Sequence, residues 1–229
     1  MGFVNIYGTR INSYEEKDLE WMRERISTAR QQVLDRRKND VDRLRCALAE
    51  MLLWHGLWDI GLDIGEYEVS YEEEKPRLLL KAGGDAKIDF SFSHSGDYVI
   101  CAISDSPIGV DVQAKSKKGA LLSDHVFSET ELLAFAEKKP ALSTGDETTA
   151  EDELLFRKFW TCKESFIKCA SEEKPNLRSV ELDFEKMPYP IVNRSDGDEF
   201  YFGIMEPDET HTLSFCVHTS EHFALSVQI

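Results

Sequence analysis

A carboxylate and an ammonium group lie one helical turn apart in the segment FRKFWTCKESFIKCA, residues 156–170. Its apolar residues predict a helix, and Trp160, Glu164 and Lys168 would form one stripe because they follow at i, i+4 and i+8. As a functional pair, Glu164 would bind a metal or accept a proton, and Lys168 would bind phosphate. As a surface ion pair, the two would contribute only ~0.3–0.5 kcal/mol.

A second polar pair lies in IGVDVQ, residues 108–113, where apolar residues alternate with Gly109, Asp111 and Gln113. Alternate side chains of a strand point to opposite faces, so Asp111 and Gln113 would share one polar face beside a turn. Taken alone, this pattern is equally typical of a strand face in contact with water.

A histidine flanked by two serines marks a third segment, FSFSHSGDYVICAIS, residues 90–104. His94 lies between Ser93 and Ser95, where a strand runs into a Gly-Asp turn. An imidazole, hydroxyls and free backbone N–H groups at such a turn could bind a phosphate. The alternative is a turn histidine that faces water.

The charge is strongly acidic overall but locally basic. The 229 residues carry a formal net charge of −16, which argues against a nonspecific nucleic-acid binder because such a protein needs a positive field. Arginines and lysines nevertheless outnumber acidic residues between Arg23 and Arg45. A local basic strip suits a compact polyanionic ligand, although each of its residues could equally belong to a solvated helix face.

Each half of the chain begins with helical patterns and ends with strand patterns. A capping box at Ser13 and Glu16 predicts a first helix, with apolar residues recurring to Ala29. Leu44 to Leu52 predict a second helix, ended by Gly56. From Glu66 onward, short alternating runs predict strands.

The second half repeats this order. We expect helices near residues 121–126, 129–137 and 153–170, and strands near 200–205, 213–217 and 223–229. The segment SFSHSGDYVICAIS in the first half resembles SFCVHTSEHFALSV in the second, which suggests an internal repeat. The polar segment at residues 138–152 predicts a surface loop. The fold class is therefore α+β, in two similar halves.

Several motifs in order resemble one known family. FSFSHS, SPIGVDVQ and FWTCKESFIK are similar to the signature blocks of the Sfp-type 4′-phosphopantetheinyl transferases. The run from Glu74 to Pro76 resembles that family's Gly-Lys-Pro block, and FSETE at residues 127–131 fits the block between its two metal motifs. The spacing agrees over nearly the whole chain, so the resemblance is specific.

The resemblance implies two α+β halves related by a pseudo-twofold, which we place at residues 1–106 and 107–229, with coenzyme A in the cleft between them. It implies transfer of the 4′-phosphopantetheine group of coenzyme A to a serine of an apo acyl or peptidyl carrier protein, with release of 3′,5′-ADP. The expected metal cofactor is Mg²⁺, because it takes hard oxygen ligands and masks phosphate charge.

The resemblance also assigns site residues. Asp111 and Glu164 match the two metal carboxylates, and Glu164 could also take the serine proton. Lys168 matches the lysine that binds the pyrophosphate and would stabilise the leaving group. The positions that match coenzyme A-binding residues are Lys75, Ser93 and His94, with Arg30, Arg36 and Arg45 as candidates for the 3′-phosphate.

Gln113 departs from the family pattern, because many relatives carry a third acidic residue there. Its amide oxygen could ligate the metal or hold a water on it, so we expect two protein carboxylates rather than three. The rival hypothesis is a catalytically weak relative that binds coenzyme A or a carrier protein without efficient transfer. A kinase or ATPase is disfavoured, because no G-x-x-x-x-G-K-[ST] loop occurs.

Other candidate residues have structural explanations. Ser128 and Glu131 form a predicted capping box that needs no catalytic role. Cys162 and Cys169 share a helix face but have no histidines nearby to complete a zinc site, and His218 and His222 flank a predicted turn.

The sequence also favours a cellular setting. Five scattered cysteines without C-x-x-C spacing favour a reducing compartment. No signal-like start or membrane span is evident, so we expect a cytoplasmic protein. Because each cleft can form within one chain, we also expect a monomer.

Overall fold

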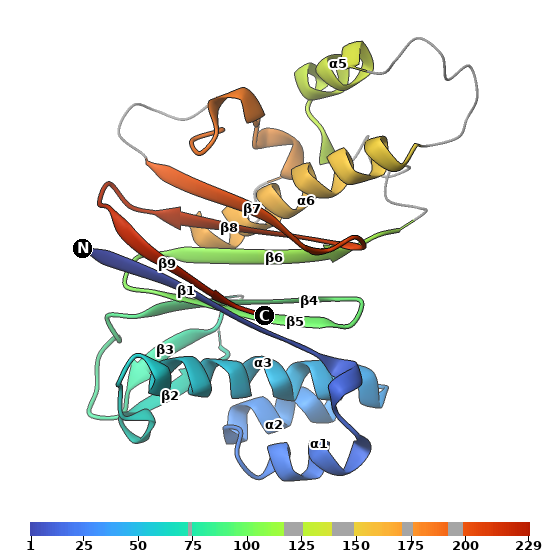
Figure 1. Cartoon of the computed structure of the whole chain (residues 1–229). Helices are drawn as coiled ribbons and strands as arrows, with labels where there is room; N and C mark the ends of the chain where they lie inside the picture. The colour runs from blue at the N-terminus through green and yellow to red at the C-terminus, as the bar shows by residue number, and fades with distance from the viewer. Residues whose placement is uncertain (73–74, 117–125, 139–148, 171–175, 192–198) are drawn as a thin grey trace.

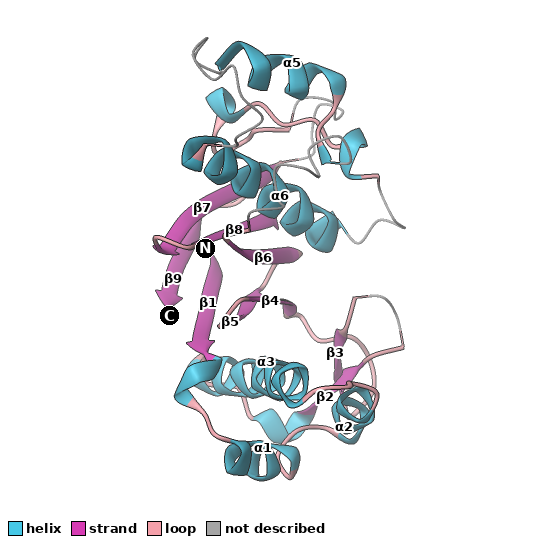
Figure 2. Ribbon diagram, turned by 90° about the vertical axis from the view of Figure 1, so that its right-hand side faces the viewer, coloured by secondary structure: helices cyan, strands magenta, loops and turns pink. Residues whose placement is uncertain are grey.

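The computed structural model describes all residues except 73–74, 117–125, 139–148, 171–175 and 192–198. The helix expected at residues 121–126 and most of the loop expected at residues 138–152 lie outside the described residues. Helices lie at the two ends of the molecule, with the two larger sheets between them (Figures 1 and 2). The fold is therefore mixed α+β, as expected.

The first sheet has the strand order β4-β5-β1-β9. Its strands are β1 (Gly2–Arg10), β4 (Asp89–Ser95), β5 (Tyr98–Ser104) and β9 (Phe223–Gln228). β1 pairs antiparallel with β5 and parallel with β9. The sequence did not predict β1, yet its buried Val4 and Ile6 alternate as strand residues should.

Three helices cover this sheet or pack beside it: α1 (Glu16–Arg23), α2 (Thr28–Asp35) and α3 (Asp40–Asp59). The expected Ser13–Glu16 capping box was wrong, because Glu15 and Asp18 form the box at α1. The single helix expected up to Ala29 was also wrong. The chain starts a new helix at α2, where the Ser27 side chain accepts a hydrogen bond from the Arg30 backbone N–H.

Gly56 does not end α3, as the sequence had suggested; it lies buried inside the helix. A β-carbon at this position would collide with the side chains of Tyr7 and Ile103. The glycine therefore lets α3 pack closely against β1 and β5, and its helical cost is offset by that packing.

Another large sheet, of order β6-β8-β7, forms the core of the second half. Its strands are β6 (Ile108–Ala114), β7 (Phe200–Asp208) and β8 (His211–His218). It is covered by α6 (Ala150–Ala170), and α5 (Glu129–Lys138) lies further out (Figure 1). A β-carbon at Gly109 would collide with the α6 backbone at Ser165 and Cys169, so this glycine allows α6 to approach β6.

The two halves share a topology. In the first half, β1 precedes the helices and the β4–β5 hairpin, and the order is β4-β5-β1. In the second half, β6 precedes the helices and the β7–β8 hairpin, and the order is β7-β8-β6. Equivalent pairs are all antiparallel.

The sequence echo compared the wrong strands, because it matched β4–β5 with β8–β9. In the structure, β8 and β9 belong to different sheets. The division at residues 106 and 107 and the pseudo-twofold axis remain predictions, and β9 carries the end of the chain back to the first sheet. A small sheet of β2 (Tyr67–Ser70) and β3 (Arg77–Leu80) completes the first half.

Candidate active site

The two halves meet where the edge strand β4 runs beside the edge strand β6. Alternate β4 residues offer side-chain oxygens to backbone N–H groups of β6. The pairs are Ile108 N to Asp89 Oδ2 (2.8 Å), Val110 N to Ser91 Oγ (3.1 Å), Val112 N to Ser93 Oγ (3.1 Å) and Ala114 N to Ser95 Oγ (3.0 Å). The spacing of two in FSFSHS thus satisfies the backbone donors of a neighbouring strand.

Asp111 lies in the middle of this seam between β4 and β6. Its side chain is nearly buried, with 6% of the residue exposed. Oδ1 accepts hydrogen bonds from Ser93 Oγ (2.8 Å) and Lys168 Nζ (2.7 Å). Oδ2 is also buried, and no residue in the described part of the chain donates to it. A buried carboxylate oxygen without a donor is costly and fits a site for a cation.

Lys168 reaches the seam from α6. Its ammonium also donates to the carbonyl oxygen of Val110 (3.0 Å), which fixes it beside the Asp111 carboxylate. The structure does not show the alternative, a surface ion pair of Glu164 with Lys168, because Lys168 pairs instead with Asp111 on β6. The two segments singled out from the sequence therefore meet.

Glu164 is half-buried on α6, one turn before Lys168. Burial raises the pKa of its carboxyl group, the nearby charge of Asp111 raises it further, and the charge of Lys168 opposes both effects. The negative charge of Asp111 therefore acts unfavourably on an ionised Glu164, and the Lys168 ammonium offsets part of that effect. A divalent cation would relieve this repulsion.

Gln113 follows Asp111 on the same face of β6 and is half-buried. Its amide Nε2 donates to the carbonyl oxygen of Ala114 at 3.4 Å. Among the described residues there is no group of three or more His, Cys, Asp or Glu side chains that could hold a metal. Asp111 and Glu164 are the two carboxylates expected to bind the metal, and that assignment stays a prediction; a third seam carboxylate, Asp89, pairs with Lys75 and accepts from Ile108 N.

A cationic cluster lies near the turn that follows β4. The His94 pKa is lowered first by loss of hydration among the surrounding protein atoms and then by the charge of Arg45. The charge of Asp42 opposes this shift, and Lys168 and Arg37 have smaller lowering effects. Arg45 donates to Asp42 Oδ1 (3.2 Å) and to the carbonyl oxygen of Gly96. Its Nε atom is buried and has no partner among the described residues. This arrangement is suited to an anion.

Arg30 and Arg36, the other two candidates for the 3′-phosphate, lie differently. Arg30 is buried, donates from Nε to the Cys46 carbonyl oxygen (2.8 Å) and stacks near the rings of Tyr71 and Phe92. Arg36 is exposed at the end of α2. The sequence analysis did not select Arg37, whose charge acts on His94. Arg36, Arg37 and Lys38 are adjacent in the sequence and follow the end of α2 at Asp35. Helical spacing therefore could not show which of their side chains points toward His94.

Lys75 lies at the opposite end of the seam. It pairs with Asp89 and donates to the carbonyl oxygen of Ile108 (3.0 Å). Lys75 therefore contacts β6 at Ile108, three residues before Asp111. Together with the cationic cluster beyond Ser95, the charged groups are distributed along the whole length of the seam.

The predicted capping box at Ser128 and Glu131 is confirmed. Ser128 N donates to Glu131 Oε2 (2.7 Å), and Glu131 N donates to Ser128 Oγ (3.2 Å). Glu131 has a second role that the sequence did not predict. Its carboxylate also accepts hydrogen bonds from the buried Lys163 (2.6 Å) and from Leu182 N (2.8 Å). A lysine within an amphipathic helix gives no sequence signal that it is buried.

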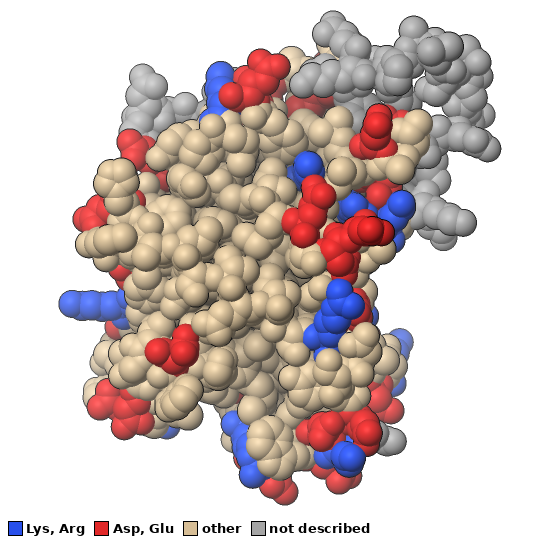
Figure 3. Space-filling model, in the orientation of Figure 1, with Lys and Arg blue, Asp and Glu red and all other residues tan. Residues whose placement is uncertain are grey.

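The remaining candidates lie away from the seam or have structural contacts. All five cysteines are free and buried. His218 stacks on Phe200 at a centroid distance of 4.4 Å. Charged side chains of both signs are interspersed at the rim of the face in Figure 3, and its middle is largely uncharged. No described helix has the length and apolar character needed to cross a bilayer.

Comparison with known proteins supports one family. A sequence model of the 4′-phosphopantetheinyl transferase superfamily matches residues 107–227, more than half of the chain. A 4′-phosphopantetheinyl transferase of Bacillus subtilis is 26% identical over 227 residues, covering 94% of this chain and 92% of the relative.

Two further relatives match over shorter stretches. The transferase gsp of Aneurinibacillus migulanus is 27% identical over 157 residues, covering 69% of this chain and 61% of its own length. Sfp of Bacillus subtilis strain 168 is 37% identical over 79 residues, covering 34% and 31%. With its motifs brought together along one seam between two α+β halves, the chain belongs to the 4′-phosphopantetheinyl transferase superfamily.

Proposed function

We propose that phosphopantetheine transfer takes place at the seam between β4 and β6, with Mg²⁺ held by Asp111 and Glu164. As a member of its family, the chain transfers the 4′-phosphopantetheine group of coenzyme A to carrier proteins. The observation that carries the site assignment is the convergence of Asp111, Glu164 and Lys168 from two distant segments at one seam.

The donor set fits Mg²⁺, which prefers hard oxygen ligands. Asp111 Oδ2 is buried without a donor among the described residues, and Glu164 adds a second carboxylate close enough to be affected by the first. Gln113 would contribute its amide oxygen directly or hold a water. When bound, Mg²⁺ would supply positive charge that masks the pyrophosphate.

Glu164 would act as the proton acceptor, directly or through a water. The carrier serine oxygen attacks the phosphorus that bears the pantetheine arm, and the bond from that phosphorus to the leaving phosphate oxygen breaks. The serine proton goes to Glu164, and the electron pair leaves with 3′,5′-ADP.

Lys168 would stabilise charge as it grows on the leaving group. Its ammonium is held by Asp111 and the Val110 carbonyl, so its position is fixed before substrate binds. Ser93 would support the site by orienting the Asp111 carboxylate, which it contacts at 2.8 Å.

The cationic cluster of Arg45 and His94 would bind the 3′-phosphate of coenzyme A. Its support is the buried Nε of Arg45, which has no partner among the described residues, together with the charges of Arg45 and Arg37 that act on His94. Arg37 joins this cluster, and Arg36 remains a candidate at its edge. Arg30 stays a candidate for the 3′-phosphate, but its buried guanidinium already donates to the Cys46 carbonyl oxygen. Lys75 remains a candidate for phosphate at the other end.

The partners follow from the reaction. The acceptor would be an apo acyl or peptidyl carrier protein, and the enzyme would act as a cytoplasmic monomer. Fatty-acid, polyketide and nonribosomal-peptide carriers all present a serine at a helix start, so a panel of purified apo-carriers would identify the physiological substrate.

Single-turnover loading of an apo-carrier with labelled coenzyme A tests the site. Glu164→Gln keeps the size of the side chain but removes a metal ligand and proton acceptor, so the rate should fall by ~10²-fold or more. Lys168→Ala should slow transfer while leaving Mg²⁺ binding nearly intact. Lys158→Ala, on the same helix, is the matched control and should transfer normally.

The outcomes separate the hypotheses. Near-normal rates in both the Glu164 and Lys168 variants would overturn the site. A wild-type protein that binds coenzyme A but does not load any carrier would instead favour the catalytically weak relative.

A further inference from the structure

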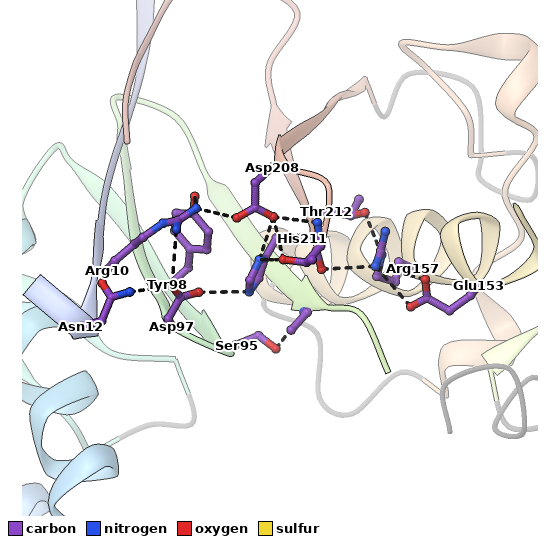
Figure 4. Close-up of polar contacts among 12 residues, drawn as sticks. Arg10, Asn12, Ser95, Asp97, Tyr98, Glu153, Arg157, Asp208, His211 and Thr212 are labelled. Carbon is purple, nitrogen blue, oxygen red and sulfur yellow. Dashed lines mark hydrogen bonds and ion pairs between the residues drawn. The ribbon is translucent and has the colours of Figure 1, made fainter. Parts of the chain in front are cut away.

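His211 is a buried histidine outside the proposed catalytic groups. It begins β8, and only 5% of the residue is exposed. It lies between the turn that joins β4 to β5 in the first half and the turn that joins β7 to β8 in the second (Figure 4). The ring meets Tyr98 edge-on, with a centroid distance of 4.7 Å. His211 therefore connects the two halves at one end of the seam.

The ring is oriented from its own turn. His211 Nδ1 lies 3.0 Å from Asp208 Oδ1 and 2.9 Å from Thr210 Oγ1. Its other nitrogen, Nε2, is buried and points toward Asp97 Oδ1, at 3.5 Å. Arg10 from β1 bridges the same two acidic residues, at 2.6 Å from Asp208 and 3.7 Å from Asp97. Arg10 and His211 thus both link two carboxylates from opposite halves (Figure 4).

The contact with the first half is tight. Gly96 has a positive φ of 58°, which is the left-handed conformation that favours glycine. A β-carbon at Gly96 would lie 2.5 Å from His211 Nε2 and 3.1 Å from the β-carbon of Ala114. The turn can therefore rest on the imidazole only because it has no side chain there.

The same turn holds the cationic cluster. The Gly96 carbonyl oxygen accepts a hydrogen bond from Arg45 Nη2, and His94 lies two residues earlier. The side chain of Ser95 anchors the strand end to Ala114 N (3.0 Å). Any displacement of Gly96 would change the position of the Arg45 guanidinium relative to His94.

We propose that His211 is a positioning residue for recognition of the 3′-phosphate of coenzyme A. It supports the Gly96–Asp97 turn from the second half, and the turn in turn holds Arg45 in place. The proposal rests on the assignment of the 3′-phosphate to Arg45 and His94. Charge-assisted hydrogen bonds to phosphate depend on geometry, so loss of the support should weaken recognition of that phosphate in particular.

Comparison of coenzyme A with 3′-dephospho-coenzyme A isolates this effect. In the wild-type enzyme, we expect coenzyme A to have the lower KM by about tenfold or more, as a charge-assisted contact predicts. His211→Ala should raise KM for coenzyme A several-fold, with kcat changed by less than about twofold, and leave KM for the dephospho form nearly unchanged. His218→Ala removes a histidine from the other end of β8 and should change neither value.

Arg45→Met distinguishes failure of the inference from failure of the site. Loss of discrimination in Arg45→Met, with partial loss in His211→Ala, supports both. Loss in Arg45→Met with normal discrimination in His211→Ala overturns the role of His211. Normal discrimination in Arg45→Met overturns the phosphate assignment, and the role of His211 with it.

A second variant covers the case in which His211→Ala does not fold. His211→Gln keeps a polar side chain of similar reach against the turn. His211→Gln should also raise KM for coenzyme A selectively, but by less than His211→Ala does. An equal rise for both substrates in a folded variant would indicate a general structural role and would contradict the proposal.

Discussion

The buried pair of Lys163 and Glu131 offers a quantitative test of how the second half is stabilised. The Lys163 side chain is fully buried, and that of Glu131 is 3% exposed. Lys163 Nζ donates to Glu131 Oε2 (2.6 Å) and to the carbonyl oxygens of Val126 (2.8 Å) and Leu177 (3.1 Å). Burial lowers the pKa of Lys163, and the charge of Glu131 opposes this effect. Each charged group therefore stabilises the ionised form of the other.

We expect Lys163→Met to reduce the free energy of unfolding by about 3 kcal/mol. Removing one partner of a buried pair costs roughly 3–5 kcal/mol, because the other charge remains uncompensated. The cost here should lie at the low end, because Ser128 N and Leu182 N still donate to Glu131. The double variant Lys163→Met/Glu131→Gln should recover part of the loss, since no unpaired charge remains.

Urea unfolding measures these changes, and Lys158→Met is the matched control on the same helix. Lys158 pairs with Glu206 at 3.0 Å, but both side chains are about a third or more exposed, so its loss should cost well under ~1 kcal/mol. If Lys163→Met were no more destabilising than Lys158→Met, the buried pair would not stabilise the fold as argued.

Two further predictions concern Asp208 and Gln113. Burial opposes ionisation of Asp208, but hydrogen bonds from Thr210 and His211 outweigh it and hold the pKa of Asp208 well below its ordinary value. The contribution of Asp208 to the free energy of unfolding is therefore fully present above the ordinary pKa and is lost as pH falls through the pKa of the folded state. The difference in unfolding free energy between wild type and Asp208→Asn should therefore shrink on acidification, and a difference that is constant or grows between neutral and acidic pH in urea titrations would contradict this. Gln113→Glu adds a carboxylate at the seam, so it should tighten Mg²⁺ binding in calorimetry, while the wild-type protein should already catalyse transfer. If only the Gln113→Glu variant catalysed transfer, the hypothesis of a catalytically weak relative would be favoured.

Much of the fold was predictable because its periodicities are strong. The strands β4, β5 and β6 and the helix α6 follow from alternation or helical spacing, and tertiary packing did not override them. The role of Gly56 was not predictable, because a glycine that ends a helix and one that permits close packing look alike in sequence. The difference depends on Tyr7 and Ile103, which lie far away along the chain.

The pairing of β1 with β9 illustrates a second limit. It joins the two ends of the chain, and no local pattern reports such a distant contact. The internal repeat was real at the level of topology, but the echo matched the wrong hairpins because short β sequences with serine and aliphatic residues resemble one another by chance.

The site was partly predictable. The spacing in IGVDVQ and FWTCKESFIK identified Asp111 and Lys168, which the structure joins. Spacing could not show that the serines of FSFSHS bind the backbone of β6, because that strand belongs to another sheet. The burial of Lys163 and His211 was likewise invisible, since it depends on what packs around them.

The most direct test of the central claim is the Mg²⁺ dependence of transfer in Asp111→Asn. This change keeps the shape of the side chain but removes the charge of a buried carboxylate, the proposed metal ligand. Asp105→Asn is the control, because Asp105 bonds the Phe3 backbone N–H at the start of β1, outside the seam. Single-turnover carrier loading is measured across a Mg²⁺ titration at saturating coenzyme A. We predict that Asp111→Asn loses transfer by ~10²-fold or more and no longer responds to Mg²⁺, while Asp105→Asn behaves as wild type. A wild-type rate and Mg²⁺ response in Asp111→Asn would contradict the account.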